Sequence, residues 1–403
     1  MNTNKQNSPK IALVYDRVNT PYGGAEKVLE AINEIFPNAS LFTSVYSQNK
    51  SNWAKKFEIK TTFLQKIKFL RENHKLIAFL MPFAFESLDL SNFDIIISIT
   101  SAEAKGILTK PNQLHVCYLL TPTRYLYSHK EKYLKSKKIL NFPIIKQMAN
   151  LALNYLSWWD KAIIFRPDLI IPISNLIKTR TKKYYQINSG KVIYPTIINQ
   201  KNFNIKINKY PDYYLCVSRL VDYKRVDLSI KAALEIGQLL VVVGKGEEKN
   251  NLIKLSGNSW IEKQKNETIT SLFERAKEQN KKIIFTNQLN SDIVNNLIAG
   301  CKALLMPGEE DFGITALEAS NFGKPVIVFY RSGVSELLID GKNAVFIKKE
   351  TTKEVVRAIK KINSLNFDKH QIKLQVSKFN KDKFKYLFKK EVLDSWKIFK
   401  LRS

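Results

Sequence analysis

Residues 303–319, ALLMPGEEDFGITALEA, contain the features that decide the fold. The apolar run Ala303–Pro307 predicts a short buried strand, and Thr315–Ala319 predicts the first turns of a helix. Glu310 and Gly313 then lie on the loop between them. Open α/β sheets bind ligands at the carboxyl ends of their strands, where helix N-termini offer unpaired N–H groups to an anion. Because two glutamates flank this loop, the ligand must carry more than an anionic group.

Short apolar runs of the same kind recur along the chain, with helical stretches between them. In the first half they are Ile11–Tyr15, Leu41–Tyr46, Phe93–Thr100, His115–Leu120, Leu169–Ser174 and Lys191–Pro195. In the second half they are Tyr213–Leu220, Leu239–Gly244, Ile283–Leu289, Ala303–Pro307, Pro325–Tyr330 and Asn343–Ile347. This alternation is typical of βαβ units and mostly parallel sheets. We therefore predict an α/β protein with two doubly wound, Rossmann-like domains.

The length of 403 residues also favours two domains of roughly 150–200 residues each. We expect a first domain over residues 1–200, a second over 201–380 and a helical tail over 381–403 that could return to the first domain. The polar, lysine- and asparagine-rich stretch from Thr196 to Lys209 is the best linker candidate.

The chain is strongly basic, with a formal net charge of +29. The imbalance is sharpest in residues 101–200, which hold 16 basic and 4 acidic side chains. Such a surface suits an acidic partner, namely a nucleic acid, an anionic membrane or a phosphorylated ligand. A lysine-rich composition that only solvates the surface is the alternative. No nucleic-acid-binding motif accompanies the charge, so we expect no nucleic acid partner.

Cysteine, histidine and hydropathy patterns place the protein in a reducing compartment, without a metal. The three cysteines are widely spaced and predict buried thiols, and the four histidines form no metal-binding pair. The polar start MNTNKQNSPK contains no signal peptide, and the apolar run from Leu76 to Phe85 is about half of what a bilayer needs. We therefore expect a cytoplasmic protein.

Residues 63–85 have the pattern of a basic amphipathic helix. Phe63, Leu64, Ile67 and Leu70 share one helical face, and the lysines and arginine of this stretch lie elsewhere. Such a helix could lie on an anionic membrane surface, although an ordinary core-facing helix has the same pattern. We expect peripheral attachment to a membrane through residues 63–75 and the basic region 101–200.

Three further motifs follow predicted strands. Gly23-Gly24 opens a predicted helix and could let the backbone approach a phosphate. Arg219 and Lys224, five residues apart on one loop, could neutralise a pyrophosphate without a metal. Gly244 begins a G-x-G turn that indicates close backbone approach.

In order and spacing, the second half resembles retaining family-4 glycosyltransferases of the GT-B fold. The matching segments are SRLVDYKRVDLSIKAA, VVVGKGEE, IIFTNQL and EEDFGITALEASNFGKPVIVFYRSGVSELLIDGKNAVFI, in which Glu310-x7-Glu318 is the most specific mark. The first half resembles the bacterial O-antigen and exopolysaccharide mannosyltransferases, in YGGAEKVLEAINEIFPNASLFTSVY, MPFAFESLDLSNFDIIIS and TPTRYLY. The likeness covers about residues 10–350.

The resemblance implies a role for each matching residue. Arg219 and Lys224 would hold the donor diphosphate and assist its departure, and Glu310 would contact the transferred hexose. Glu318 would bind the ribose hydroxyl groups. The other substrate-binding residues implied are Gly23, Gly24, Arg124, Gly244, Phe312, Gly313, Ile314 and Thr315. The nucleotide-sugar donor would lie in an interdomain cleft, mostly on the second domain, with no metal or other cofactor.

We therefore expect a retaining glycosyltransferase that moves mannose from GDP-mannose to a lipid-linked or polysaccharide acceptor. Two positions depart from the family. Leu120 stands where many members carry a histidine near the donor hexose, and Asn175-Leu176 replaces an Asn-Ser pair. A UDP- or ADP-sugar donor, and a non-catalytic nucleotide-sugar-binding partner in polysaccharide assembly, are the alternatives.

Overall fold

The computed structural model describes residues 8–68, 71, 78–128, 143–196 and 210–402, which form two compact units. The first unit comprises residues 1–195 and 384–403, and the second comprises residues 196–383. The predicted linker falls mostly on residues 197–209, which lie outside the described residues.

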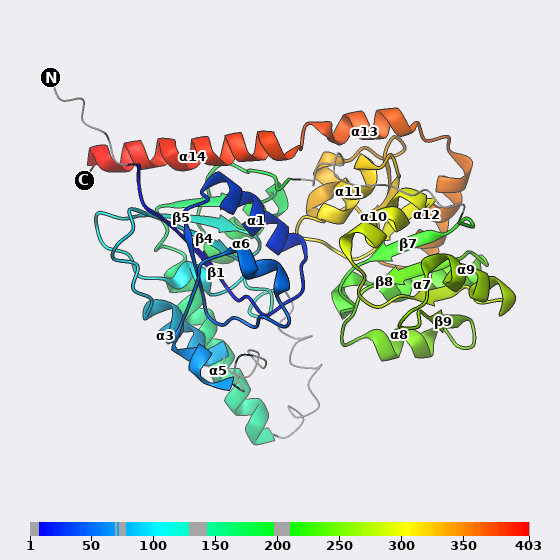
Figure 1. Ribbon diagram of the computed structural model, residues 1–403, viewed down its shortest axis with the longest axis horizontal. Coiled ribbons are helices and arrows are strands. Elements are labelled where there is room, and N and C mark those ends of the chain that lie inside the picture. Colours follow the sequence, from blue (N-terminus) through cyan, green and yellow to red (C-terminus); the bar gives the residue numbers. More distant parts are fainter. Residues whose placement is uncertain (1–7, 69–70, 72–77, 129–142, 197–209, 403) are drawn as a thin grey trace. The chain divides into compact units, whose positions relative to one another are not determined.

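The first unit is built on a parallel sheet of six strands (Figure 1). The strand order is β3-β2-β1-β4-β5-β6, which is the doubly wound order with its switch point between β1 and β4. The strands are β1 (Ile11–Tyr15), β2 (Ser40–Thr43), β3 (Ile59–Thr61), β4 (Ile95–Thr100), β5 (Leu114–Leu119) and β6 (Leu169–Pro172). Its main helices are α1 (Gly24–Ile35), α3 (Met81–Glu86), α5 (Pro143–Ile163) and α6 (Asn175–Tyr185).

The second unit carries a parallel sheet of seven strands in the order β13-β12-β11-β7-β8-β10-β9. The strands are β7 (Tyr214–Val217), β8 (Leu240–Val243), β9 (Trp260–Glu262), β10 (Ile283–Phe285), β11 (Ala303–Met306), β12 (Val326–Phe329) and β13 (Ala344–Ile347). The helices are α7 (Val226–Glu235), α8 (Lys249–Leu255), α9 (Ile269–Glu278), α10 (Ser291–Gly300), α11 (Ile314–Asn321), α12 (Thr352–Ser364) and α13 (Lys369–Ser377). The direction in which successive strands are added to this parallel sheet reverses between the neighbours β7 and β11, which is its switch point. The predicted α/β fold with two Rossmann-like units is confirmed.

The last helix, α14 (Lys381–Arg402), packs on the first unit. Phe384 and Phe388 are buried and lie against Tyr118 of β5, with ring centroids 6.1 and 5.3 Å away. Lys385 also lies 3.3 Å from Glu34 of α1. Residues separated by more than 250 positions in sequence therefore share one core.

Two sequence predictions of secondary structure were wrong. Lys191–Pro195 is not a strand, although Gly190 and Ile193 each donate one hydrogen bond to the β6 segment. Residues 63–75 do not form one continuous helix, because a 3₁₀ helix over Phe63–Lys66 ends at Ile67, whose backbone is extended. Leu70 and Lys75 lie outside the described residues. No helix among the described residues is long and apolar enough to span a bilayer.

Candidate substrate-binding site

The predicted phosphate-binding residues lie at the switch point of the second sheet. Arg219 and Lys224 follow β7, and the loop that holds Glu310 follows the neighbouring strand β11. Lys224 forms an ion pair with Glu310, and its ammonium group lies 5.3 Å from the Tyr223 ring centroid. Arg219 is exposed and donates to the Tyr223 hydroxyl group over 2.8 Å. The fold therefore brings together two cations and an acid that are about 90 residues apart in sequence.

Backbone packing fixes the loop that carries Glu310. A Cβ atom on Gly308 would lie 2.2 Å from the carbonyl oxygen of Tyr223, so only glycine permits this contact. On the other side, the Glu310 amide donates to Ser332 Oγ over 3.1 Å, and Gly333 donates to the Glu310 carbonyl over 2.9 Å. Sequence reasoning missed Ser332 and Gly333. Their position directly after β12, at the same sheet edge, was the available signal.

The N-terminus of α11 lies next to this loop. Gly313 adopts the left-handed conformation, with φ of +97°, and no side chain of the described residues caps the helix. Its first residues, Ile314 and Thr315, are partly exposed. An uncapped helix N-terminus attracts negative charge, because its first N–H groups lack intrahelical partners. Phe312 is buried against the loop and has a packing role.

Glu318 stands in the second turn of α11 and is largely buried, as is Glu310. Along the chain, the helix N-terminus therefore lies between two acids, with the Lys224–Glu310 pair before it and Glu318 after it. This arrangement suits a ligand with an anionic centre and hydroxyl groups at both ends, because carboxylates accept hydrogen bonds from hydroxyl groups.

The G-x-G turn makes the close backbone approach that we predicted, and its role in substrate binding stays a prediction. A Cβ atom on Gly244 would lie 1.9 Å from the Ser218 carbonyl oxygen, and one on Gly246 would lie 2.0 Å from that of Leu220. The close approach is therefore to the loop that carries Arg219, and these glycines position that loop.

The switch point of the first sheet is organised by Asp16, which directly follows β1. Its carboxylate accepts hydrogen bonds from Thr100 Oγ1 at 2.6 Å and from the amides of Ser101 and Ala104 at 2.8 and 2.9 Å. These contacts join the ends of β1 and β4. The sequence signal was an acid directly after a buried strand, which our predictions did not use.

The Gly23-Gly24 pair begins α1, as predicted, with Gly23 as its N-cap. A Cβ atom on Gly23 would lie 3.0 Å from Glu26 Oε2. The other carboxylate oxygen of Glu26 accepts hydrogen bonds from the hydroxyl groups of Tyr15 and Thr20, both at 3.0 Å. In the described contacts, the missing side chain of Gly23 leaves room for the Glu26 carboxylate near the start of the helix.

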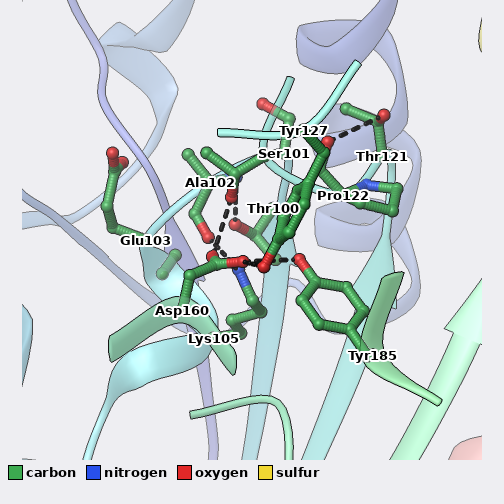
Figure 2. Close-up of polar contacts among 12 residues, drawn as sticks. Thr100, Ser101, Ala102, Glu103, Lys105, Thr121, Pro122, Tyr127, Asp160 and Tyr185 are labelled. Carbon is green, nitrogen blue, oxygen red and sulfur yellow. Dashed lines mark hydrogen bonds and ion pairs between the residues drawn. The ribbon is translucent and has the colours of Figure 1, made fainter. Parts of the chain in front are cut away.

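A buried polar network centred on Asp160 of α5 holds the TPTRYLY segment (Figure 2). Asp160 forms an ion pair with Lys105 at 2.6 Å, and both side chains are almost fully buried. It also accepts hydrogen bonds from the hydroxyl groups of Thr123, Tyr127 and Tyr185 at 2.8, 2.8 and 2.7 Å. Burial, followed by the charge of Asp160, raises the pKa of Tyr127 and Tyr185. Arg124 is half-buried on the same segment.

A second buried acid, Glu103, contacts the same segment. It accepts a hydrogen bond from the Tyr125 hydroxyl group over 2.7 Å, and Arg17 lies 3.8 Å away. Burial raises the pKa of Glu103, and the Arg17 guanidinium partly offsets that rise. Sequence reasoning also missed Lys105, Asp160 and Glu103, because no local motif marks them.

Within the part of the first unit that the structure describes, the one histidine, His115, does not stand in for the histidine that Leu120 replaces. Leu120 is buried directly after β5. His115 is fully buried near the opposite end of β5, where its Nε2 lies 2.9 Å from Ser98 Oγ. Burial, followed by the charge of Arg166, lowers the pKa of His115 to about 3. The imidazole is therefore neutral and part of the core.

Comparison with known proteins identifies the class. Residues 198–376 match the family described as "Glycosyl transferases group 1", so the match covers most of the second unit. Together with the two Rossmann-like sheets, this match confirms the resemblance to glycosyltransferases of the GT-B fold.

Several relatives are mannosyltransferases. The chain is 30% identical over 211 residues to "Alpha-1,3/1,6-mannosyltransferase ALG2" of Candida glabrata, which covers 45% of this chain and 46% of that protein. It is 28% identical over 286 residues to the protein of the same name from Saccharomyces cerevisiae, covering 58% of this chain and 56% of the relative. The matched regions span about half the length of these relatives.

Solved structures share the fold over nearly the whole chain. The lipopolysaccharide outer core galactosyltransferase WaaB superposes with a TM-score of 0.61 at 17% identity, covering 96% of this chain and 99% of that one. HepE of Anabaena, in complex with UDP and glucose, superposes with a TM-score of 0.62 at 17% identity, covering 96% of this chain and 100% of that one. At this identity the likeness shows the fold alone.

Proposed function

We propose that this protein is a retaining mannosyltransferase that uses GDP-mannose and a lipid-linked or polysaccharide acceptor in surface glycan biosynthesis. The family match and the mannosyltransferase relatives support sugar transfer. The observation that carries the proposal is the grouping of Lys224, Glu310 and the uncapped N-terminus of α11 at one switch point.

In the proposed mechanism, the cations of the second unit stabilise the leaving diphosphate. Negative charge develops on the oxygen that links the sugar to the diphosphate as this bond breaks, and Arg219 and Lys224 would bind that charge without a metal. Fixed cations are effective here because they need no reorganisation during the reaction. We propose no covalent nucleophile.

The Lys224–Glu310 ion pair suggests how the donor would bind. A diphosphate that contacts Lys224 would compete with the Glu310 carboxylate for the ammonium group. Glu310 would then be free to accept hydrogen bonds from the hexose, while Glu318 accepts those of the ribose. The first unit would hold the acceptor. We propose a cytoplasmic location, peripheral to the inner face of the membrane.

Release of GDP from GDP-mannose tests this function. We expect slow release without acceptor, and none above background in Arg219→Ala. Lys231→Ala removes an exposed cation from α7 and is the matched control, which should retain the activity.

The same assay distinguishes two alternative functions from the proposed one. Faster turnover of UDP-glucose or ADP-glucose would keep the reaction class and replace the donor. A non-catalytic nucleotide-sugar-binding partner is suggested by Leu120 and Leu176, which depart from the family pattern. Binding of the nucleotide without turnover of any donor, in the presence of acceptor lipids, would favour that alternative.

A further inference from the structure

Helix α5 exposes a row of large apolar side chains. Met148, Leu151 and Trp158 are 66%, 64% and 67% exposed, and Tyr155 between them is also exposed. Their spacing of three, four and three residues places them on one face of the helix. We call these four residues the outer face of α5. The opposite face is buried through Leu153, Leu156 and Ile163 and so belongs to the core.

The neighbouring helices also expose large apolar side chains. Phe79 and Phe83 are exposed on the 3₁₀ helix Ala78–Leu80 and on α3. This region packs against α5, since Ala78 contacts the Leu153 and Leu156 cluster and Glu86 accepts a hydrogen bond from Trp159 Nε1 at 3.0 Å. Scattered exposed apolar residues are ordinary on a protein surface, but a continuous apolar helix face marks an interaction site.

Exposed positive charge on α5 and α6 favours an anionic partner. Residues 101–200 hold 16 basic and 4 acidic side chains, and two of these acids, Glu103 and Asp160, are buried. Lys105 is buried as well, through its ion pair with Asp160. Among the described residues of this stretch, the exposed charged side chains are nevertheless mostly basic. Lys161 on α5 is exposed, as are Lys178, Lys182 and Lys183 on α6, which is joined to α5 by the Tyr185–Asp160 hydrogen bond.

We propose that the outer face of α5 docks the protein onto an anionic lipid bilayer. Leu151, Met148 and Trp158 would insert among the acyl chains, and the lysines would contact the acidic headgroups. Tyr155 and Trp158 stack with ring centroids 6.3 Å apart, and both side chains combine an apolar ring with a polar atom suited to a bilayer interface. A second copy of the chain fits poorly, because it would bring the same positive charge against itself.

This surface lies within the region 101–200 that we expected to contact the membrane, and it bears on the proposed function. Asp160 lies on the inner side of α5 and holds Thr123 and Tyr127 of the TPTRYLY segment. One helix would therefore link the bilayer to the carboxyl edge of the first sheet, where the proposed function places the acceptor. The biological reason for membrane docking rests on the proposed function, whereas the exposed apolar face and the lysines are observed independently of it.

Flotation with vesicles tests the inference. The probes are vesicles of phosphatidylglycerol mixed with phosphatidylcholine, and vesicles of phosphatidylcholine alone. We expect the wild type to prefer the anionic vesicles, and this preference to fall as salt rises. The double variant Leu151→Ser and Trp158→Ser should bind at least about tenfold more weakly. Leu374→Ser, which removes an exposed leucine of α13 in the second unit, is the matched control and should bind normally.

Three results would overturn the inference. The first is that the double variant binds anionic vesicles as the wild type does. The second is that the double variant and Leu374→Ser lose equal amounts of binding. The third is that the wild type self-associates, and that the double variant loses this self-association but still binds vesicles. Lys161→Glu is a second variant that reverses a charge without touching the apolar residues, and it should weaken binding to anionic vesicles alone. GDP affinity is measured in every variant. Lost vesicle binding with normal GDP affinity supports the docking surface, whereas loss of GDP binding with normal flotation contradicts only the proposed function.

Discussion

Glu310 and Glu318 are eight residues apart, yet their positions differ in a way that separates their expected roles. Glu310 lies on a loop held by Ser332 and Gly333 and is paired with Lys224. Glu318 lies within α11, beyond the helix N-terminus. In the proposed donor complex the first contacts the hexose and the second contacts the ribose.

Single substitutions of these acids should therefore have different effects. Glu318→Ala should weaken GDP binding about 10- to 150-fold, because a lost charge-assisted hydrogen bond costs roughly 1.5–3 kcal/mol. Glu310→Ala should leave GDP affinity undiminished, since it releases Lys224 from a competing partner, but should lower turnover. Calorimetric titration and steady-state kinetics measure both, and Glu309→Ala is the charge-matched control. Equal losses of GDP affinity in the two variants would refute this division of roles.

The core histidine should make stability depend on pH. The pKa of His115 is about 3 in the folded protein and about 6.5 when unfolded, so the unfolded chain binds the additional proton. Its contribution to stability is complete above about pH 6.5 and is lost as pH falls below that value, by at most about 1.4 kcal/mol per pH unit.

His115→Gln should remove this part of the pH dependence. Urea unfolding of wild type and variant, compared from about pH 7 down to about pH 5, isolates it from the other groups. A wild-type slope no steeper than that of the variant would show that His115 is accessible to protons in the folded state.

At the scale of elements, α14 should be part of the first unit's stability. Phe388 is fully buried against Tyr118, so Phe388→Ala should lower the free energy of unfolding by about 3–5 kcal/mol. Tyr386→Ala, at an exposed position of the same helix, should change it by less than about 0.5 kcal/mol. Urea unfolding followed by circular dichroism compares them. Similar, small effects of both changes would mean that α14 is not docked in solution.

The sequence predicted most strands because buried parallel strands are continuous apolar runs. It missed β3 and β9, whose sequences IKT and WIE are short and contain a charge. Both are edge strands, which are commonly short and charged because this limits pairing with other chains. The predicted helix over 63–85 was wrong for a different reason. Amphipathic spacing does not reveal the break at Ile67. In the structure Leu64 is buried, and Thr62 caps the short turn that ends at this break.

At the scale of the whole molecule, the sequence indicated the switch-point loops of the second sheet but only some of their contacts. Strand-to-loop motifs indicated Arg219, Lys224 and Glu310, because each lies within a few residues of the end of a recognisable apolar run. The Asp160 network could not be predicted, since Lys105 and Asp160 are 55 residues apart and neither follows a motif. Likewise, glycine spacing indicated close approach at Gly244 without revealing that its neighbour is another backbone segment.

Binding of GDP in the presence of a chelator tests the central claim, which is that two cations of the second unit bind a nucleoside diphosphate without a metal. We expect calorimetry to show GDP binding that EDTA leaves unchanged and that Arg219→Ala weakens by about 10- to 150-fold. Lys231→Ala should bind as the wild type does. Failure of GDP, UDP and ADP alike to bind, loss of binding with EDTA, or full affinity in Arg219→Ala would contradict the claim.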